Sequence, residues 1–382
     1  MLPLSYALRN LFRDKSRLIQ TVGGSALVVL LIMAATALNG GMAGVLSASG
    51  SPRNAILIGT GSEESIQRSE VAAQLGGIAE AGIPGVLSAL GTPAASTEIH
   101  YMSFLEAKDG TRGQGLFRGV TLRALLVHPE VRLLEGTFPG AGEVMVGRLA
   151  WRKLGIAEEK LQVGSVVKLD GSEMRISGIF AAPGTVMESE VWAVLGDLYM
   201  LAQRDTASCV VLRMEEAKDF SEVELFSQQR LDLELTALRE SDYYSALGAF
   251  YRPLRVMTWI TAGLVAAGAI FGGFNTLYAA FASRIRELAT LQAIGFGRGA
   301  VFFSLVQESV IACLAGTLLA SVIALVFLDG RTIPFSIGAF TVSISPQVAI
   351  AGLGTGILLG VLGAVPPAIR CLKPSLPKAL RS

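Results

Sequence analysis

Charged residues are scarce in this chain, and so are the side chains that usually build catalytic or metal sites. They make up 16% of 382 residues, against about 25% in a typical soluble domain. Three cysteines, Cys209, Cys313 and Cys371, match no disulfide or paired-ligand spacing, so we expect buried, unpaired thiols. His100 and His128 have no carboxylate or cysteine partner at ligand spacing, which predicts surface or satisfied histidines and no metal site.

The balance of charge excludes further classes of protein. Net charge is +1, so no overall basic field favours nucleic acid. A hydrophobic fraction of 51% and a mean hydropathy of +0.53 exceed what a soluble chain could bury. Residues 39–255 nevertheless hold 27 acidic and 20 basic side chains, which predicts a water-exposed domain between membrane segments.

Four apolar runs have the roughly 20 residues that cross a bilayer. They are residues 18–38, 256–282, 300–328 and 348–369. An alternative for the first run is a cleavable secretory signal, because a basic leader precedes it and Ala35-Thr36-Ala37 follows its core. The run is longer than the usual signal core, which favours a retained span.

Basic residues predict the orientation, because short cytoplasmic loops are enriched in Lys and Arg. Residues 1–17, 283–299 and 370–382 together hold eleven basic side chains, whereas the loop 329–347 has one. Both termini are therefore predicted to be cytoplasmic, with residues 39–255 and 329–347 outside. Arg252 and Arg255 run against this rule.

The pattern of residues 39–255 predicts mixed α and β structure. Alternating or short apolar runs between glycines indicate strands at 55–59, 98–107, 116–120, 143–146, 166–169, 174–180 and 231–235. Helical spacing indicates a helix over 66–81 and a stalk helix from Asp242 toward the second span, and Asp170-Gly171 predicts a hairpin turn.

The outer loop 332–345 alternates apolar and polar residues about Gly338. This pattern predicts a small hairpin. The hairpin could lie at the membrane surface or pack under the large domain, and both alternatives stay open.

Three motifs resemble one known family. The first is the leader 7–17; the second is Asn275-Thr276 followed by Arg284–Gly295 and Glu308; the third is Pro366–Arg370 with Pro374 and Leu380-Arg381. Segments 134–138, 143–147, 163–165 and 177–180 resemble the same family's extracytoplasmic core. Together they are similar to the MacB/FtsX-type permeases, the transmembrane subunits of type VII ABC transporters.

The resemblance implies a fold and partners. The fold is a membrane protein of four transmembrane α-helices, with a large α+β extracytoplasmic domain, a MacB-like periplasmic core, between helices 1 and 2. Residues 1–17 would be a cytoplasmic amphipathic helix, and the protein would lie in the bacterial inner membrane. The implied partners are a cytoplasmic ABC ATPase, a second identical or paralogous permease, a periplasmic adaptor and membrane lipids, with no nucleic acid.

The chain itself is expected to be a non-catalytic subunit without a cofactor. It contains no G-x-x-x-x-G-K-[ST] phosphate loop. ATP and magnesium would therefore be bound by the partner ATPase.

The family match assigns residues 283–299 to a coupling helix seated in the ATPase. Its candidate residues are Arg284, Arg286, Glu287, Leu288, Leu291 and Gly295. Arg284 and Glu287 are three residues apart and close enough to pair. The alternative is an ordinary loop helix whose arginines only anchor the topology.

Polar and small residues inside the spans are further candidates. Glu308 is an intramembrane carboxylate, which is costly and needs a partner; it could form a switchable polar contact or proton relay, or be satisfied by a neighbouring helix. Small residues four apart let helices approach closely, and they serve either dimer contact or packing within the chain: Gly268, Gly272, Gly352, Gly356 and Gly360.

The expected function is to transmit ATP-driven motion to the outside domain for export, efflux, or extraction of a lipid or lipoprotein. An alternative is a signalling subunit that senses a ligand or activates a cell-wall enzyme. A secondary transporter fits poorly, because four spans show no inverted repeat.

Overall fold

The computed structural model describes residues 3–374, with the side chains of Leu4 and Ser5 excepted. The chain forms two compact units. The helical unit comprises Met1–Gly40, Pro253–Arg331 and Val342–Ser382, and the sheet unit comprises Gly41–Arg252 and Thr332–Thr341. Most of the predicted tail 370–382 lies outside the described residues.

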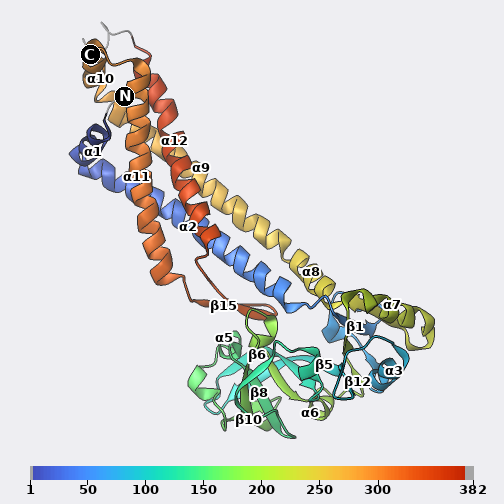
Figure 1. Cartoon of the computed structure of the whole chain (residues 1–382). Coiled ribbons are helices and arrows are strands. Elements are labelled where there is room, and N and C mark those ends of the chain that lie inside the picture. The colour runs from blue at the N-terminus through green and yellow to red at the C-terminus, as the bar shows by residue number, and fades with distance from the viewer. Residues whose placement is uncertain (1–2, 375–382) are drawn as a thin grey trace. The chain divides into compact units, whose positions relative to one another are not determined.

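Six helices contribute to the helical unit (Figure 1). They are α1 (Leu4–Arg13), α2 (Lys15–Ser49), α9 (Arg252–Ala282), α10 (Ile285–Ala293), α11 (Arg298–Phe327) and α12 (Pro346–Leu372). Within residues 3–374, α2, α9, α11 and α12 are long and apolar enough to cross a membrane, and each contains one predicted run. The chain is therefore a membrane protein.

Helix α2 extends beyond the predicted span. It continues to Ser49, past the predicted boundary at residue 38, because no proline interrupts the chain before Pro52. Pro253 lies at the second position of α9, where its missing N–H costs no helical hydrogen bond.

The leader helix α1 buries Ala7 and Leu11 within the described chain and leaves Leu8 and Phe12 exposed. The sequence places Leu4, Leu8 and Leu11 on one side, which is expected to meet the membrane interface or the ATPase, and that expectation stays a prediction. The side chain of Leu4 lies outside the described residues.

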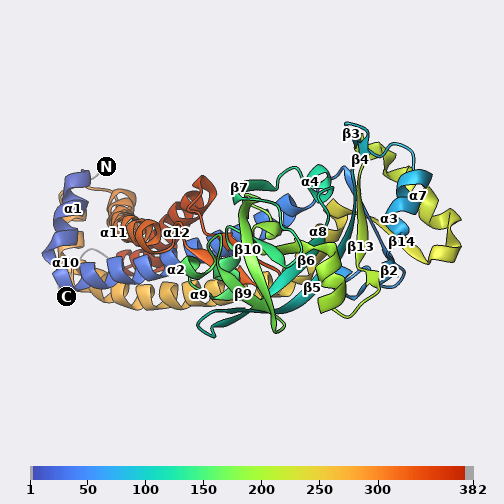
Figure 2. The same ribbon diagram turned by 90° about the horizontal axis from the view of Figure 1, so that it is seen from below.

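The sheet unit is built on ten strands in the order β14-β1-β13-β5-β6-β11-β8-β10-β7, with β9 pairing with β10 and β5 (Figure 2). Only the pairs β6–β11 and β8–β10 are parallel. The strands are β1 (Asn54–Gly59), β5 (Ala95–Ala107), β6 (Arg112–Val120), β7 (Arg132–Gly136), β8 (Glu143–Gly147), β9 (Val166–Leu169), β10 (Ser172–Ala181), β11 (Val191–Val194), β13 (Cys209–Arg213) and β14 (Leu235–Arg239).

Short helices and strands complete the sheet unit. The α-helices are α3 (Leu75–Gly82), α4 (Ala124–Val127), α5 (Ala150–Leu154), α6 (Leu195–Leu201), α7 (Phe220–Gln229) and α8 (Glu240–Phe250). The 3-10 turns are η1 (Ile66–Arg68), η2 (Glu158–Lys160), η3 (Val186–Ser189), η4 (Ala217–Asp219) and η5 (Leu231–Leu233). Two small strand pairs are β2 (Val71–Ala72) with β12 (Thr206–Ala207), and β3 (Ser88–Ala89) with β4 (Thr92–Pro93).

Two sequence predictions in the sheet unit are wrong. The helix predicted over 66–81 begins only at Leu75. Residues before it are held by other contacts: the Gly59 N–H donates to Ser69 Oγ at 2.9 Å, and Val71–Ala72 pairs with β12 as a strand. The predicted strand 231–235 is instead η5, and the strand begins only at Leu235, where pairing with β1 starts.

The β9–β10 hairpin is confirmed. Its turn residues have φ of 49° at Asp170 and 85° at Gly171, the left-handed pair that a two-residue type I′ turn requires. The cysteines of the described chain are free and buried, as expected.

The hairpin β15 (Thr332–Phe335) and β16 (Gly338–Thr341) packs on the sheet unit, which decides between the two alternatives for the outer loop. Lys153 Nζ of α5 donates to the carbonyls of Phe335 and Ser336, each at 2.9 Å. The Phe335 ring lies 5.9 Å from the Tyr251 ring. A Cβ on Gly41 would lie 2.5 Å from the Phe340 ring, so the ring occupies the space that this glycine leaves.

Candidate functional site

The segment between α9 and α11 forms a short helix closed by a glycine turn. Helix α10 begins after Arg284 and ends at Ala293. Gly295 has φ of 109°, a conformation that side chains other than glycine rarely adopt. The Phe296 N–H then donates to the Leu291 carbonyl at 3.1 Å, so the chain reverses tightly into α11.

The inner face of α10 packs on the end of the helical bundle. Leu288 is buried with Val301 and Leu305 of α11, and Leu291 packs beside them. Ala368 and Cys371 of α12 belong to the same apolar cluster. Movement of α10 would therefore act directly on α11 and α12.

Glu308 of α11 is the centre of an ionic network in the helical unit. Its carboxylate, 3% exposed, accepts hydrogen bonds from Arg284 Nη1 at 3.1 Å to each oxygen, and it also pairs with Arg17 of α2. Glu287 of α10 lies 3.5 Å from Arg284 Nε and 2.8 Å from Arg13 Nη1 of α1. The network thus connects α1, α2, α10 and α11.

The sequence predicts that Glu308 needs a partner, and the structure supplies two, Arg17 and Arg284. The sequence pairs Arg284 with Glu287 but does not identify Arg13 and Arg17, which are more than 270 residues away in the chain. Glu308 is the only carboxylate in the predicted span 300–328. A basic residue next to another span, such as Arg17, could therefore have been suggested as its partner.

The outer face of α10 is exposed in the described chain. Arg286, Thr290, Ala293 and Ile294 are exposed, and spacings of four, seven and eight residues place them on one stripe. Ile294 is 71% exposed. Of the six predicted coupling residues, only Arg286 lies on this stripe; Thr290, Ala293 and Ile294 were missed, since single exposed apolar residues carry no sequence signal.

The predicted glycines fall into two groups. A Cβ on Gly352 would lie 2.9 Å from Met33 of α2, and one on Gly360 would lie 2.7 Å from the Val310 Cα of α11; one on Gly356 would lie closer still to Thr317 Oγ1 of α11. These three glycines pack α12 within the chain. Gly268 and Gly272 of α9 have no atom within 4 Å of such a Cβ.

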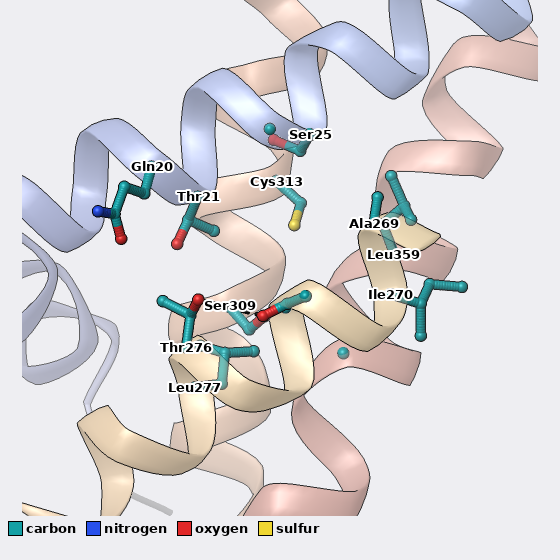
Figure 3. Close-up of a pocket in the computed structure, with 14 residues that line it drawn as sticks. Gln20, Thr21, Ser25, Ala269, Ile270, Thr276, Leu277, Ser309, Cys313 and Leu359 are labelled. Carbon is teal, nitrogen blue, oxygen red and sulfur yellow. Dashed lines mark hydrogen bonds between the residues drawn. The ribbon is translucent and has the colours of Figure 1, made fainter. Parts of the chain in front are cut away.

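A cavity of about 260 Å³ lies among α2, α9, α11 and α12. Figure 3 shows Thr21 and Ser25 of α2 with Thr276 of α9 and Cys313 of α11 around it. Gly24, Gly272, Gly273 and Gly363 also line it. Its existence reflects the loose packing of α9, of which only Ala262, Leu277 and Phe281 are buried.

The sheet unit contains a separate buried ionic cluster. Arg118 of β6 donates from Nε and Nη2 to the two oxygens of Glu190, both at 2.8 Å, and from Nη1 to Glu98 of β5 at 2.7 Å. His128 Nε2 lies 3.1 Å from Glu98 Oε1, and its Nδ1 lies 3.9 Å from Glu240 of α8. Both predicted histidines are buried beside carboxylates: His100 Nε2 lies 3.4 Å from Glu98, and His128 Nδ1 lies 3.6 Å from Glu130 without a hydrogen bond.

Burial disfavours the charged form of every group in this cluster. The neighbouring charges of opposite sign determine whether the pKa of each group nevertheless favours the charged form. Arg118 and His128 hold the pKa of Glu98 well below its ordinary value despite its burial. Burial disfavours the His128 imidazolium, but the carboxylates of Glu98, Glu130 and Glu240 together outweigh it and raise the pKa of His128 to about 10. Burial raises the pKa of Glu240.

Glu98, His100 and Cys209 bring ligand atoms within 4.8 Å of one another. Both Glu98 oxygens are already used by Arg118 and His128, and a cation would meet the Arg118 guanidinium. Burial also raises the pKa of the Cys209 thiol well above its ordinary value. These residues fit an ion-pair cluster better than a metal centre.

Glu240 connects the cluster to the chain segments that enter the sheet unit. Its Oε2 accepts hydrogen bonds from the Ser51 N–H at 3.0 Å and from Asn54 Nδ2 at 2.9 Å. Ser51 follows the end of α2, and Glu240 begins α8. One buried carboxylate therefore fixes both entry segments to the domain.

Residues 259–376 match the FtsX-like permease C-terminal family. The match covers α10, α11, α12 and most of α9, and it contains the second resembling motif and the beginning of the third. The predicted resemblance is confirmed for this segment. No curated protein matches the chain significantly.

Solved structures similar to part of the chain include three domains. The periplasmic region of MacB from Actinobacillus actinomycetemcomitans is 9% identical, with a TM-score of 0.40, over 52% of this chain and 94% of that one. The extracellular domain of the noncanonic ABC-type transporter YknZ from Gram-positive bacteria is 13% identical (TM-score 0.37; 48% and 99%). A domain of a permease protein from Porphyromonas gingivalis is 14% identical (TM-score 0.33; 48% and 86%). TM-scores this low do not assign the fold of the sheet unit.

Proposed function

We propose, on the premise that residues 259–376 form an FtsX-like permease C-terminal segment, that this chain is the membrane subunit of an ATP-driven transporter. It would lie in the bacterial inner membrane with α1 and α10 on the cytoplasmic side. A partner ATPase would bind ATP and magnesium, and this chain would be non-catalytic. The work would be export, efflux, or extraction of a lipid or lipoprotein through paired permeases, with a periplasmic adaptor.

The observation that carries this proposal is the two-faced character of α10. Its outer stripe, Arg286, Thr290, Ala293 and Ile294, is exposed, whereas its inner residues Leu288 and Leu291 pack on α11 and α12. A helix with an exposed stripe and a packed face can receive a push on one side and pass it on at the other. Gly295 allows the tight reversal that orients it.

The ionic network would spread that movement to the other helices. Because Arg284 and Glu287 pair with Glu308 and Arg13, displacement of α10 changes contacts with α1, α2 and α11 together. The chain crosses between its two units at four points. Motion of the helical unit would therefore reach the sheet unit through α2, the α8–α9 junction and both ends of the hairpin β15–β16.

The experiment is affinity purification of the full-length chain in mild detergent from its native cells. We expect a phosphate-loop ATPase to co-purify with the wild type. Ile294→Asp places a charge at the C-terminal end of the exposed stripe, and should lower recovery of the ATPase by tenfold or more while leaving the permease folded.

Arg298→Asp, at an exposed position just outside α10, tests whether any negative charge on this face disrupts binding. Equal loss with both variants would mean general repulsion. Absence of an ATPase from the wild-type preparation would refute the proposal and favour the signalling alternative.

A further inference from the structure

Parts of two resembling motifs that the proposed function does not use meet in one groove of the helical unit. Asn275 of α9 and Pro366, Pro367 and Arg370 of α12 line a cavity of about 450 Å³, together with the rings of Phe271, Phe274 and Tyr278. We infer that this groove binds the headgroup of an anionic glycerophospholipid, whose phosphodiester is held by Arg370 and Asn275. This inference does not depend on ATP coupling.

The wall of the groove has the composition of a membrane interface. Phe271, Phe274, Asn275 and Tyr278 recur at spacings that place them on one face of α9. Phe271 and Phe274 pack edge to face at 5.8 Å, and the side chains of Phe271 and Tyr278 are 70% and 47% exposed. Tyr side chains concentrate at membrane–water interfaces, so Tyr278 suits the headgroup level, and the apolar rings of Phe271 and Phe274 suit the upper acyl region of a lipid.

The depth of the groove agrees with a headgroup. Tyr278 lies four residues before the end of α9 and Arg370 lies two before the end of α12, which is about 6 Å and about 3 Å along each helix. This is the end of the helices that carries α10 (Figure 1). Lipid phosphates and ester carbonyls are available at that level.

Two hydrogen-bond donors in the groove have no acceptor in the described chain. Arg370 and Asn275 are both exposed, and within residues 3–374 neither side chain makes a hydrogen bond or ion pair. A guanidinium and an amide beside aromatic rings, at a membrane surface, favour an acceptor that carries negative charge. A phosphodiester offers several such oxygens.

The chain does not supply that charge itself. The helical unit has four acidic residues. Glu287 and Glu308 belong to the ionic network, Asp14 accepts from the Arg17 N–H, and Asp329 accepts from the Ile344 N–H at the other end. A second copy pressed against the groove would bring the same arginine and no free carboxylate. An ammonium headgroup would likewise find no carboxylate, which favours phosphatidylglycerol over phosphatidylcholine.

The test is native mass spectrometry of the full-length protein in detergent, titrated with phosphatidylglycerol and phosphatidylcholine of matched acyl chains. One basic residue near a membrane surface contributes about 1 kcal/mol, so we expect phosphatidylglycerol to bind about fivefold more tightly. Arg370→Gln should abolish this preference, and Phe271→Ala should weaken both lipids. Asn275→Leu, which does not remove charge, should weaken phosphatidylglycerol less than Arg370→Gln.

Arg298→Gln is the matched control, because it removes one exposed base from the same end of the helices. It should retain the preference. Equal affinity for both lipids, or an equal loss in Arg298→Gln, would overturn the inference in favour of diffuse surface attraction. Competition by inorganic phosphate at lipid-like concentrations would assign the groove to free anions instead. If Phe271→Cys forms a disulfide-linked dimer, and the yield of that dimer is the same with and without added lipid, the groove is a contact with a second copy of the chain.

Discussion

Glu308 illustrates at the residue scale how a buried charge can be both costly and structurally decisive. Its carboxylate is 3% exposed and lies between two guanidiniums, Arg17 and Arg284, whose side chains are 9% and 11% exposed. Each of the three groups has lost most of its water, so each depends on the others. Neutralising the carboxylate leaves two cations facing each other.

Glu308→Gln should therefore destabilise the protein more than its small change in size suggests. Removing one partner of a buried ion pair costs about 3–5 kcal/mol, and thermal unfolding of the detergent-purified chain measures it. Glu287→Gln is the control, since that carboxylate is 42% exposed and its pairs should contribute at most about 1 kcal/mol. Equal effects of the two variants would show that Glu308 is not the centre of the network.

His128 makes stability depend on pH in the opposite sense to acid denaturation. Its pKa is raised from 6.5 to about 10 in the folded chain, so the folded state holds the proton more tightly than the unfolded state. The stabilisation is complete below about pH 6.5 and is lost as pH rises toward 10. The melting temperature should fall over this range in the wild type, and the fall should be smaller in His128→Gln. Parallel curves would contradict the assignment.

At the scale of elements, the helical unit combines one tight helix pair with one loosely held helix. Helix α12 packs through Gly352, Gly356 and Gly360 on α2 and α11, whereas a Cβ on Gly268 or Gly272 of α9 would have no neighbouring atom within 4 Å among the described residues. The cavity beside α9 is lined in part by Gly272, one of these two glycines. Helix α9 is therefore the element best placed to move or to meet a second permease.

Gly360→Leu should disrupt the fold, while Gly268→Leu should not. A Cβ on Gly360 would meet the Val310 backbone at 2.7 Å, and backbone cannot yield as a side chain can. We expect poor recovery of monodisperse Gly360→Leu by size-exclusion chromatography and normal recovery of Gly268→Leu in monomeric form. If Gly268→Leu also prevents folding, α9 is packed more tightly than its exposure indicates.

At the scale of the whole molecule, sequence reasoning succeeded where one physical property dominates. The four apolar runs, the acidic middle segment and the β9–β10 turn follow from hydrophobicity, charge and positive φ, each of which is local. The strand order, the cluster around Glu98 and the pairing of Arg17 with Glu308 are long-range, and no local pattern encodes them. The stripe on α10 was missed for the same reason, because exposure is a property of the folded chain.

The central claim is that ATP binding by the partner ATPase moves the sheet unit through the helical unit. It is tested most directly by pulsed electron–electron resonance between spin labels on Leu231→Cys, an exposed site of the sheet unit, in the two permeases of the reconstituted complex. The account predicts a label separation that shifts by several ångströms when a hydrolysis-deficient partner ATPase binds ATP, and no shift when Ile294→Asp removes the partner. Steady ATP hydrolysis by the wild-type complex, with identical separations in the nucleotide-free and ATP-bound states, would contradict it.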